Sequence, residues 1–403
     1  MSVGETIGGE LLPVDGCEIA VLEAGIRYPN RRDLVIFKLA ESSQVAASFT
    51  QNRFCAAPVT VAKKHLEDGR VRALVVNTGN ANAGTGPQGL EDASNTCDAV
   101  ASLLNIEANQ VLPFSTGVIG ELLPMPVLIR GIEASRDQFD RDQWLSAAHG
   151  IMTTDTVPKG ISKRITLSAG DVVLTGISKG AGMIKPNMAT MLSFVATDAV
   201  IDEALLVDLC QCSVDQSFNR ITVDGDTSTN DACVLIATGA SKVSLSSQQD
   251  IDTFRTALDE LMLFLATAIV RDAEGATKFI RVRVNNARSS AEACKVGYAV
   301  AESPLVKTAF FASDPNWGRI LAAVGRAGID DLSTELIDIF LEDVCIVSKG
   351  GVSSDYSEAM GQEVMNRAEI EVTIDLGRGN ISESIYTSDL SHDYVSINAD
   401  YRS

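Results

Sequence analysis

Short apolar runs bounded by turn residues dominate the first third of the chain, and this pattern predicts β-strands. The runs CEIAVLEAGI (17–26) and DLVIFKLAE (33–41) have strand composition, and Ala73–Val76 has the pattern of a short buried strand. Helical spacing is clearest over 89–106, where small and apolar residues share one stripe. The residues of that stripe are Ala93, Cys97, Val100, Ala101 and Leu104.

The middle and the end of the chain mix strands with helices. KRITLSAG and DVVLTGISKG form a hairpin pattern, and a helix that starts near Ser135 is expected to run into a threonine-rich turn at Thr153, Thr154 and Thr156. Asp202 fits the N-cap position of the next helix, and a long helix is expected over 249–270. Roughly the last ninety residues are expected to alternate short strands, and apolar alternation continues up to Ile397. The pattern therefore predicts an α/β protein, with a weak boundary near residue 285 and a smaller C-terminal part.

The stretch Lys179–Asp198, KGAGMIKPNMATMLSFVATD, changes character in its middle. Gly180 and Gly182 permit positive φ and Pro186 fixes φ, so the first half suits an unusual backbone path. From Thr190 onward the residues are apolar and β-prone, which predicts a strand. A strained loop before a strand that begins on a hydroxyl residue is typical of a self-cleaving chain with an N-terminal nucleophile. The alternative is an ordinary glycine loop before a core strand.

Composition and charge limit the classes of function. The chain has 403 residues, enough for two domains or one large layered domain, and its hydrophobic content of 45% is ordinary for a globular protein. The formal net charge of -20 argues against nucleic-acid or acidic-membrane binding and fits the handling of small molecules. The N-terminal residues lack a secretory pattern, and no apolar run approaches the roughly 18 residues of a membrane span. We therefore expect a soluble cytoplasmic protein.

The metal-binding residue types show no ligand pattern. The eight cysteines are scattered without a CxxC pair, and the three histidines lack ligand spacing, so no zinc site is predicted. The cysteines are interpreted as free thiols in a reducing compartment. Asp224, Asp226 and Asp231 resemble a calcium loop, but the terminal glutamate of an EF-hand is missing, so we expect turn and hydrogen-bond chemistry there.

Polar turns follow two of the predicted strands. The segment 77–86 (NTGNANAGTG) places amides at a strand end, where ligands often sit; it could equally be a surface turn, and it does not match a phosphate-binding P-loop. The second strand is expected to stop at Ser115, Thr116 and Gly117. A hydroxyl followed by glycine supplies one side-chain donor and one accessible amide, as in an oxyanion hole, although most such turns are only turns. Glu274, between a helix end and a strand, is either solvated or a cation ligand.

Threonine needs an adjacent base to act as a nucleophile, because its hydroxyl is hardly ionised at neutral pH. The chain offers no credible Ser-His-Asp set and no GxSxG motif. An N-terminal threonine carries its own base, since its α-amine has a reference pKa of roughly 7.7–8.0. That amine exists at Thr190 only after the preceding peptide bond is cut. The same hydroxyl can make the cut by an N-to-O acyl shift, which loop strain would assist.

Six motifs occur in order: NTGNANAGTG, STGVIG, KGAGMIKPNMATML, VDGDTSTND, AESPLVKTAFFASDPNWGRI and YVSINADYRS. Together they resemble the ornithine acetyltransferase family of arginine biosynthesis, the ArgJ proteins. The similarity spans essentially the whole chain, and the NMATML core is its most specific part. The resemblance implies a layered αββα sandwich of the ArgJ and DmpA type. Residues 190–284 would complete its main domain, and residues from about 285 to 403 would form a smaller C-terminal α/β subdomain.

The resemblance also implies a processed enzyme. The precursor would cleave itself between Ala189 and Thr190 into an α chain (1–189) and a β chain (190–403), associating as an α2β2 assembly. Thr190 would accept acetyl from N-acetylornithine and pass it to glutamate in two ping-pong half-reactions, with no metal or bound cofactor. Some relatives also take acetyl from acetyl-CoA, and the form of the KGAGMIKPNMATML motif favours such a bifunctional enzyme.

Residue by residue, the resemblance implies an oxyanion hole at Thr116 and Gly117, which agrees with the interpretation of that turn. The substrate-contacting positions that it implies are Thr153, Lys179, Thr190, Glu274, Asn398 and Ser403. Many relatives carry threonine at the last position, where Ser403 keeps the hydroxyl and lacks the methyl group. Glu274 would attract the ammonium group of the substrate, and Lys179 its carboxylate or the reacting centre.

Other functions are compatible with parts of this pattern. A self-processing aminopeptidase or amidohydrolase of the DmpA group would share the nucleophile region and use water in place of glutamate. An ornithine acetyltransferase without acetyl-CoA activity would carry the same motifs. A non-catalytic binding or scaffold protein would keep the fold and never cleave. Self-cleavage and glutamate dependence separate these hypotheses.

Overall fold

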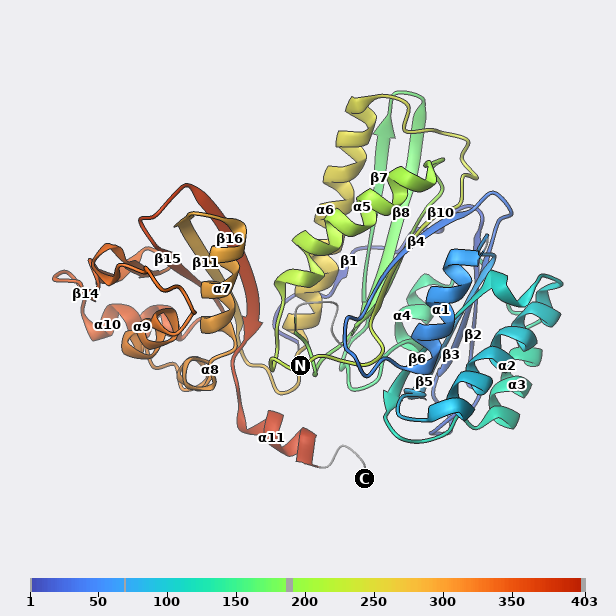
Figure 1. The fold of residues 1–403 in the computed structure, drawn as a ribbon, viewed down its shortest axis with the longest axis horizontal. Coiled ribbons are helices and arrows are strands. Elements are labelled where there is room, and N and C mark those ends of the chain that lie inside the picture. Colours follow the sequence, from blue (N-terminus) through green and yellow to red (C-terminus); the bar gives the residue numbers. More distant parts are fainter. Residues whose placement is uncertain (1, 69, 186–190, 400–403) are drawn as a thin grey trace. The chain divides into compact units, whose positions relative to one another are not determined.

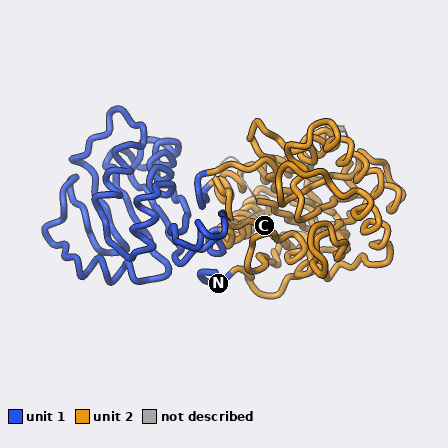
Figure 2. The backbone as a smooth tube through the Cα atoms, turned by 90° about the horizontal axis from the view of Figure 1, so that it is seen from below, with its two compact units in different colours: residues 1–5, 220–225, 270–403 blue, residues 6–219, 226–269 orange. Residues whose placement is uncertain are grey.

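The computed structural model describes residues 2–68, 70–185 and 191–399 (Figure 1). The chain forms two compact units, coloured separately in Figure 2. The large unit consists of Thr6–Asn219 and Asp226–Ile269, and the small unit consists of Met1–Glu5, Arg220–Gly225 and Val270–Ser403. Each unit has its own sheets and helices and is described separately below.

The large unit contains two β-sheets. The six-stranded sheet has the order β1-β7-β8-β9-β10-β4. Its strands are β1 (Ile7–Gly8), β4 (Gln44–Phe49), β7 (Lys159–Leu167), β8 (Gly170–Lys179), β9 (Leu192–Thr197) and β10 (Ala232–Ala237). The four-stranded sheet has the order β2-β3-β5-β6. Its strands are β2 (Cys17–Leu22), β3 (Leu34–Leu39), β5 (Ala73–Asn80) and β6 (Val111–Val118).

The two sheets pack face to face through an apolar core. Phe194 of β9 lies 5.2 Å from the ring of Phe37 on β3 and 5.3 Å from the ring of Phe114 on β6, measured between centroids. Trp144 from α4 (Trp144–Gly150) is fully buried in the same core. Each strand alternates its side chains between this core and the opposite face of its sheet, so both sheets need a second covering layer.

Helices supply those covering layers. On the outer face of the four-stranded sheet, α2 (Gly86–Leu104) and α3 (Met125–Ala134) bury Val100 and Leu128 against β3 and β5, while α1 (Ala57–Asp68) packs beside β6. On the six-stranded sheet, α5 (Glu203–Gln216) packs against β4 and β10, and α6 (Gln248–Arg271) packs against β8. The order helix, sheet, sheet, helix confirms the predicted αββα sandwich (Figure 1).

The small unit is a mixed sheet with helices. Its strand order is β14-β13-β12-β15-β11-β16. The strands are β11 (Phe279–Ala287), β12 (Asp338–Leu341), β13 (Val344–Ser348), β14 (Gly351–Val352), β15 (Glu369–Asp375) and β16 (Ile381–Ser388). The helices are α7 (Ser290–Ala301), α8 (Pro304–Phe311), α9 (Trp317–Gly325), α10 (Glu358–Met365) and α11 (His392–Ala399). A core of aliphatic residues from the sheet and from α7, α8, α9 and α10 holds this unit together.

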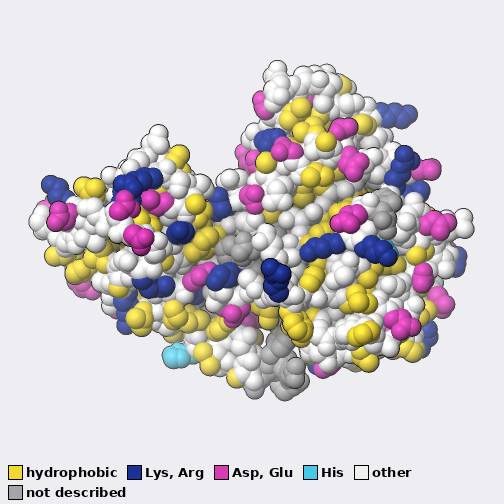
Figure 3. Space-filling model, viewed as in Figure 1, with side chains coloured by type: hydrophobic (Ala, Val, Ile, Leu, Met, Phe, Trp, Pro, Cys, Tyr) yellow, Lys and Arg dark blue, Asp and Glu magenta, His cyan; other side chains and the backbone are white. Residues whose placement is uncertain are grey.

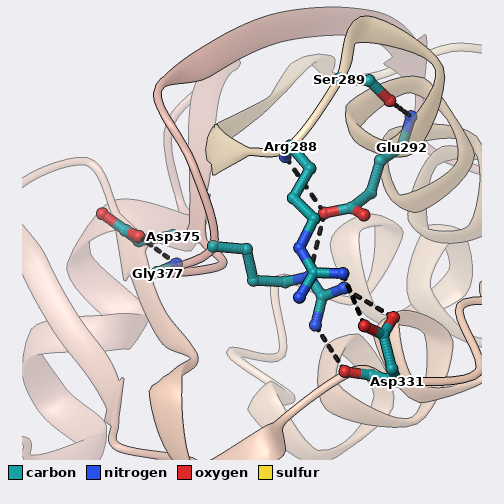
Figure 4. Close-up of polar contacts among 7 residues, drawn as sticks. Arg288, Ser289, Glu292, Asp331, Asp375 and Gly377 are labelled. Atoms are coloured by element: carbon teal, nitrogen blue, oxygen red, sulfur yellow. Dashed lines mark hydrogen bonds and ion pairs between the residues drawn. The ribbon is translucent and has the colours of Figure 1, made fainter.

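A charged network fastens one loop of the small unit to the start of α7 (Figure 4). The Arg378 side chain is 3% exposed, and its guanidinium donates to Glu292 at 3.1 Å and to Asp331 at 2.7 Å. Arg288 donates to the other oxygen of Asp331 at 2.5 Å. Figure 3 shows both acidic and basic side chains at the surface of the face that it draws.

Several elements differ from those expected. The helix predicted from Ser135 is limited to α4, because Asp140 pairs through its backbone with Ile19 of the edge strand β2. Helix α3 was assigned to no element by the sequence pattern. The apolar alternation that ends at Ile397 lies on the helix α11. By contrast, the β7–β8 hairpin and the Asp202 N-cap, which accepts from the Ala204 N–H, are confirmed.

Helix α7 lies so close to β16 that only glycine fits at position 297. A Cβ added to Gly297 would lie 2.6 Å from Cγ1 of the buried Ile385. We expect Gly297→Ala to lower the free energy of unfolding by about 1–3 kcal/mol through overpacking. The matched control is Gly325→Ala, at the end of α9, where an added Cβ meets no atom within 4 Å. The control should be neutral or stabilising by up to about 1 kcal/mol in denaturant titrations, and equal losses in both variants would contradict the account.

Candidate active site

The predicted oxyanion turn lies where β5 and β6 run in parallel. Thr116 pairs with Thr78 and Gly117 with Gly79, so β6 continues through the turn to Val118 instead of stopping at Ser115. Gly117 has φ of 136°, and a Cβ there would lie 2.3 Å from the carbonyl carbon of Gly79. Any side chain at this position would separate the two strands, so a glycine is required. The closeness of the strands explains the glycine of this motif.

Lys179 reaches this turn from the other sheet. It is the last residue of β8 and is 2% exposed, and its Nζ donates to Oγ1 of Thr116 at 3.3 Å. The two residues come from different sheets and are separated by 63 positions in sequence. The structure therefore brings together two of the residues that the sequence motifs singled out. Since the lysine donates to Oγ1, the hydroxyl hydrogen of Thr116 stays available to donate elsewhere.

A buried carboxylate that the sequence analysis did not select, Asp155, links the next two predicted residues. Its Oδ2 accepts from the backbone N–H of Thr153 at 2.9 Å. Its Oδ1 accepts from Nζ of Lys159 and from the N–H of Gly180, each at 2.7 Å. Asp155 thus ties the backbone at Thr153 to the residue that follows Lys179.

The charge state of Asp155 follows from these contacts. Burial alone would raise its pKa, but the positive charges of Lys159 and Lys179 and the N–H of Gly180 outweigh burial and hold the pKa below its usual range. The side chains of Asp155 and Lys159 have no exposed area. The one sequence signal was the spacing of Asp and Lys by four positions, which indicates a pair only on a helix. Residues 153–159 lie outside any helix, so that signal could not be used.

The predicted nucleophile, Thr190, and the preceding Ala189 lie outside the described residues, as does Ser403. The residues that flank the gap are described. Before the gap, Gly180 has φ of 150° and Met183 has φ of 58°, so the loop takes the unusual backbone path that its composition predicts. After it, Met191 donates from its backbone N–H to Oδ1 of Asp231 at 2.7 Å. The β-strand predicted from this point is β9.

Glu274 and Asn398 meet within the small unit. Nδ2 of Asn398, on α11, donates to Oε2 of Glu274 at 2.8 Å. Glu274 is 9% exposed and precedes Gly275, whose carbonyl accepts from the hydroxyl of Ser391 at 2.6 Å. These contacts dock the C-terminal helix on the loop between α6 and β11. These two residues belong to motifs that are far apart in the sequence, yet they are joined by a direct hydrogen bond.

The described part of the chain holds no group of three or more His, Cys, Asp or Glu side chains arranged to bind a metal ion. Two of the aspartates of the 224–231 loop make hydrogen bonds instead: Asp224 accepts from the hydroxyl of Tyr394 at 3.2 Å, and Asp231 accepts from Met191. Among the helices in the described ranges, none is both long and apolar enough to cross a membrane.

Comparison with known proteins identifies the class. The model of the ArgJ family matches residues 18–403, and the chain belongs to this family. It is 53% identical to a protein of Pseudomonas syringae pathovar tomato and 52% identical to one of Pseudomonas fluorescens, both named arginine biosynthesis bifunctional protein ArgJ; both matches cover 100% of each chain. A solved ArgJ structure from Bacillus halodurans is 37% identical, covers 50% of this chain and 95% of its own, and has a TM-score of 0.48.

Removing the Asp155 carboxylate should destabilise the large unit. Asp155→Ala leaves Lys159 as a buried charge without its carboxylate, and we expect the free energy of unfolding at pH 7 to fall by about 3–5 kcal/mol. Because the folded-state pKa lies below the ordinary value of 3.8, the carboxylate's contribution is complete above that pH. It is lost as the pH falls through the folded-state pKa, so the difference from wild type should shrink in acid.

The control for this prediction is Glu18→Ala, which breaks an exposed ion pair with Lys38 in the same unit. That pair is about half exposed on both sides, and its loss should change the free energy of unfolding by at most about 1 kcal/mol. Urea titrations of both variants and of the wild type provide the measurement. A loss in Asp155→Ala no larger than the control's would show that the buried carboxylate is not a structural link.

Proposed function

We propose that this protein is a self-cleaving acetyltransferase of arginine biosynthesis, which moves acetyl from N-acetylornithine to glutamate through an acetyl ester on Thr190. It also acetylates glutamate from acetyl-CoA. The observation that carries this proposal is identity of 52–53% over complete chains with proteins named arginine biosynthesis bifunctional protein ArgJ. The contact between Lys179 and Thr116 supports it, because it lies at the turn to which the motifs assign the oxyanion hole.

The proposal includes the state of the working enzyme. Cleavage between Ala189 and Thr190 yields an α chain of residues 1–189 and a β chain of residues 190–403, which remain associated as an α2β2 assembly in the cytoplasm. The substrates are small molecules, and acetyl-CoA enters as a co-substrate. The reaction needs no metal and no bound cofactor, because an acyl-threonine carries the acetyl group between the two half-reactions.

Self-cleavage begins with the Thr190 hydroxyl. Its Oγ1 attacks the carbonyl carbon of Ala189, the C–N peptide bond breaks, and the proton of the hydroxyl passes to the released amine. The resulting ester is hydrolysed by water, which frees the hydroxyl again and gives Ala189 its carboxylate. The positive φ of Met183, a residue with a side chain in the segment before the cut, supports this step, since backbone strain in that segment would favour the acyl shift.

Acetyl transfer then uses the new α-amine of Thr190 as its base. The amine takes the hydroxyl proton while Oγ1 attacks the acetyl carbonyl of N-acetylornithine, and the proton passes to the leaving ornithine amine. The Thr116 hydroxyl and the Gly117 N–H would donate to the oxyanion formed at the carbonyl oxygen. In the second half-reaction the amine of glutamate attacks the ester carbonyl and forms the amide C–N bond, the C–O bond to Thr190 breaks, and the amine proton passes through the α-amine to Oγ1.

The family motifs assign substrate recognition to charged and polar groups. Glu274 would bind the ammonium group, and Asn398 would orient the Glu274 carboxylate through the hydrogen bond that joins them. Lys179 would bind a carboxylate or support the reacting centre, and Thr153 and Ser403 would contribute polar contacts. One site must accept both ornithine and glutamate, so contacts to their shared α-amino-acid part should dominate.

Self-cleavage is tested on purified full-length protein. We expect two bands on a denaturing gel, and a fragment that begins at Thr190 by mass spectrometry. Thr190→Ala removes the attacking hydroxyl and should leave a single uncut band. Thr166→Ala, an exposed threonine of β7, is the control and should cleave as the wild type does. An uncut wild type, or a cleaved Thr190→Ala variant, would refute the mechanism.

Transfer is tested by following loss of N-acetylornithine with and without glutamate. Turnover should depend on glutamate, and Thr116→Ala should lower kcat by about 100- to 1000-fold, as for the loss of one oxyanion donor. Thr116→Ser retains the hydroxyl and should restore most of the rate. Consumption that ignores glutamate would instead identify a hydrolase. The same assay with acetyl-CoA as sole donor should yield N-acetylglutamate if the enzyme is bifunctional.

A further inference from the structure

Two consecutive buried residues, Asn230 and Asp231, connect the oxyanion turn to the segment that follows the nucleophile. They end the 224–231 loop directly before β10, and they are 7% and 1% exposed. None of the roles proposed above uses them as a pair. Their side chains contact different segments, and each side chain bonds one backbone group that adjoins a proposed reacting position, the Ser115 carbonyl for Asn230 and the Met191 N–H for Asp231.

Asn230 binds the backbone at Ser115, the residue before the proposed oxyanion donors. Its Nδ2 donates to the carbonyl of Ser115 at 2.9 Å and to the carbonyl of Ala81 at 2.6 Å, and its Oδ1 accepts from the hydroxyl of Thr229 at 2.5 Å. The Ser115 carbonyl belongs to the same planar peptide group as the N–H of Thr116. A hydrogen bond that holds this carbonyl therefore fixes the orientation of the peptide group before Thr116, and with it the direction of the Thr116 side chain.

Asp231 binds the backbone of Met191, the residue that follows the proposed nucleophile in sequence. Its Oδ1 accepts from the N–H of Met191 at 2.7 Å, while the carbonyl of Met191 accepts from Ala232 at 3.1 Å. The N–H of Met191 belongs to the peptide group that joins it covalently to Thr190. Both polar backbone groups of Met191, the residue that follows Thr190 in sequence, are thus bonded to one short segment.

Burial of the Asp231 carboxyl group is energetically unfavourable. Its Oδ2 is buried and has no hydrogen-bond partner within the described ranges. Burial raises the pKa of Asp231 well above its usual value, although the N–H of Met191, the positive charge of Lys179 and the hydroxyl of Ser228 act in the opposite direction. A buried polar atom without a partner costs stability, so packing alone does not account for this residue.

We propose that Asn230 and Asp231 form a positioning device that fixes, from one rigid segment, the peptide before Thr116 and the peptide after Thr190. This inference rests on the proposed function, because it takes Thr190 as the nucleophile and Thr116 as an oxyanion donor. This dipeptide, directly before β10, then sets the distance between the attacking Thr190 and the oxyanion donor Thr116. Since such alignment errors of about 1 Å cost about 100-fold in rate, both residues should act on kcat.

The first test compares self-cleavage in two variants of Asp231. Asp231→Ala removes the acceptor for Met191 and should slow cleavage by about 100-fold. Asp231→Asn keeps an oxygen acceptor at the same place and should cleave within about tenfold of the wild type. The control is Asp198→Ala. Asp198 follows the C-terminal end of β9, and its buried carboxyl group accepts a hydrogen bond from the Val173 N–H. The control should lower the unfolding temperature and leave the cleavage rate unchanged.

The second test measures transfer by Asn230→Ala, with rates normalised to the number of cleaved Thr190 ends. Loss of both donors should lower kcat by about 100-fold and leave KM for N-acetylornithine within about threefold, since ground-state contacts are untouched. A merely structural role would lower the unfolding temperature and the soluble yield without changing kcat per cleaved end.

The outcomes separate this proposal from the one on which it rests. A wild type that neither cleaves nor transfers acetyl refutes the proposed function itself. A competent wild type with Asp231→Ala and Asn230→Ala at control rates refutes the positioning role alone. Equal losses in Asp231→Ala and Asp231→Asn would overturn the acceptor role of Asp231. If Asp231→Ala is insoluble, Asn230→Ala decides: reduced kcat at constant KM supports the device, and unchanged kcat overturns it.

Discussion

The packing of two β-sheets through three phenylalanine rings is the constraint on which the candidate site depends. Phe114 lies two positions before Thr116 on β6, and Phe194 lies two positions after Leu192, the register partner of Lys179. The ring contact at 5.3 Å therefore fixes the spacing of the sheets beside the Lys179–Thr116 hydrogen bond. A core contact that any stable sandwich needs also sets the distance between a cation and a hydroxyl from opposite layers.

Buried charge is the second organising feature of the large unit. Asp155 and Lys159 are fully buried, and a hydrophobic pair of similar volume would serve stability as well or better. What a hydrophobic pair could not supply is the set of directed bonds from Asp155 to the backbone at Thr153 and Gly180. In the same way, Asn230 joins segments that lie 115 positions apart. Polar groups in this core hold loops in register, at some expense of stability.

Local patterns in the sequence were enough to predict much of this structure. The β7–β8 hairpin, the Asp202 N-cap and the αββα class follow from short-range periodicity, turn chemistry and family motifs. Asp155 and Asn230 could not be predicted, because their partners are set by tertiary contacts and their neighbouring residues read as ordinary polar turns. The apolar alternation up to Ile397 is typical of a strand, whereas these residues lie on the helix α11, whose Asn398 docks on Glu274. The roles of Thr190 and Ser403 remain predictions from the motifs.

The central claim is that acetyl passes through an ester on Thr190, and the intact mass of the C-terminal fragment tests it most directly. The purified protein is mixed with N-acetylornithine in the absence of glutamate, the reaction is quenched in acid, and the intact mass is measured by mass spectrometry. The account predicts that the fragment beginning at Thr190 gains the mass of one acetyl group, and that adding glutamate before the quench removes it. A fragment that stays unmodified while N-acetylornithine is consumed, or an acetyl group located on another residue, would contradict the account.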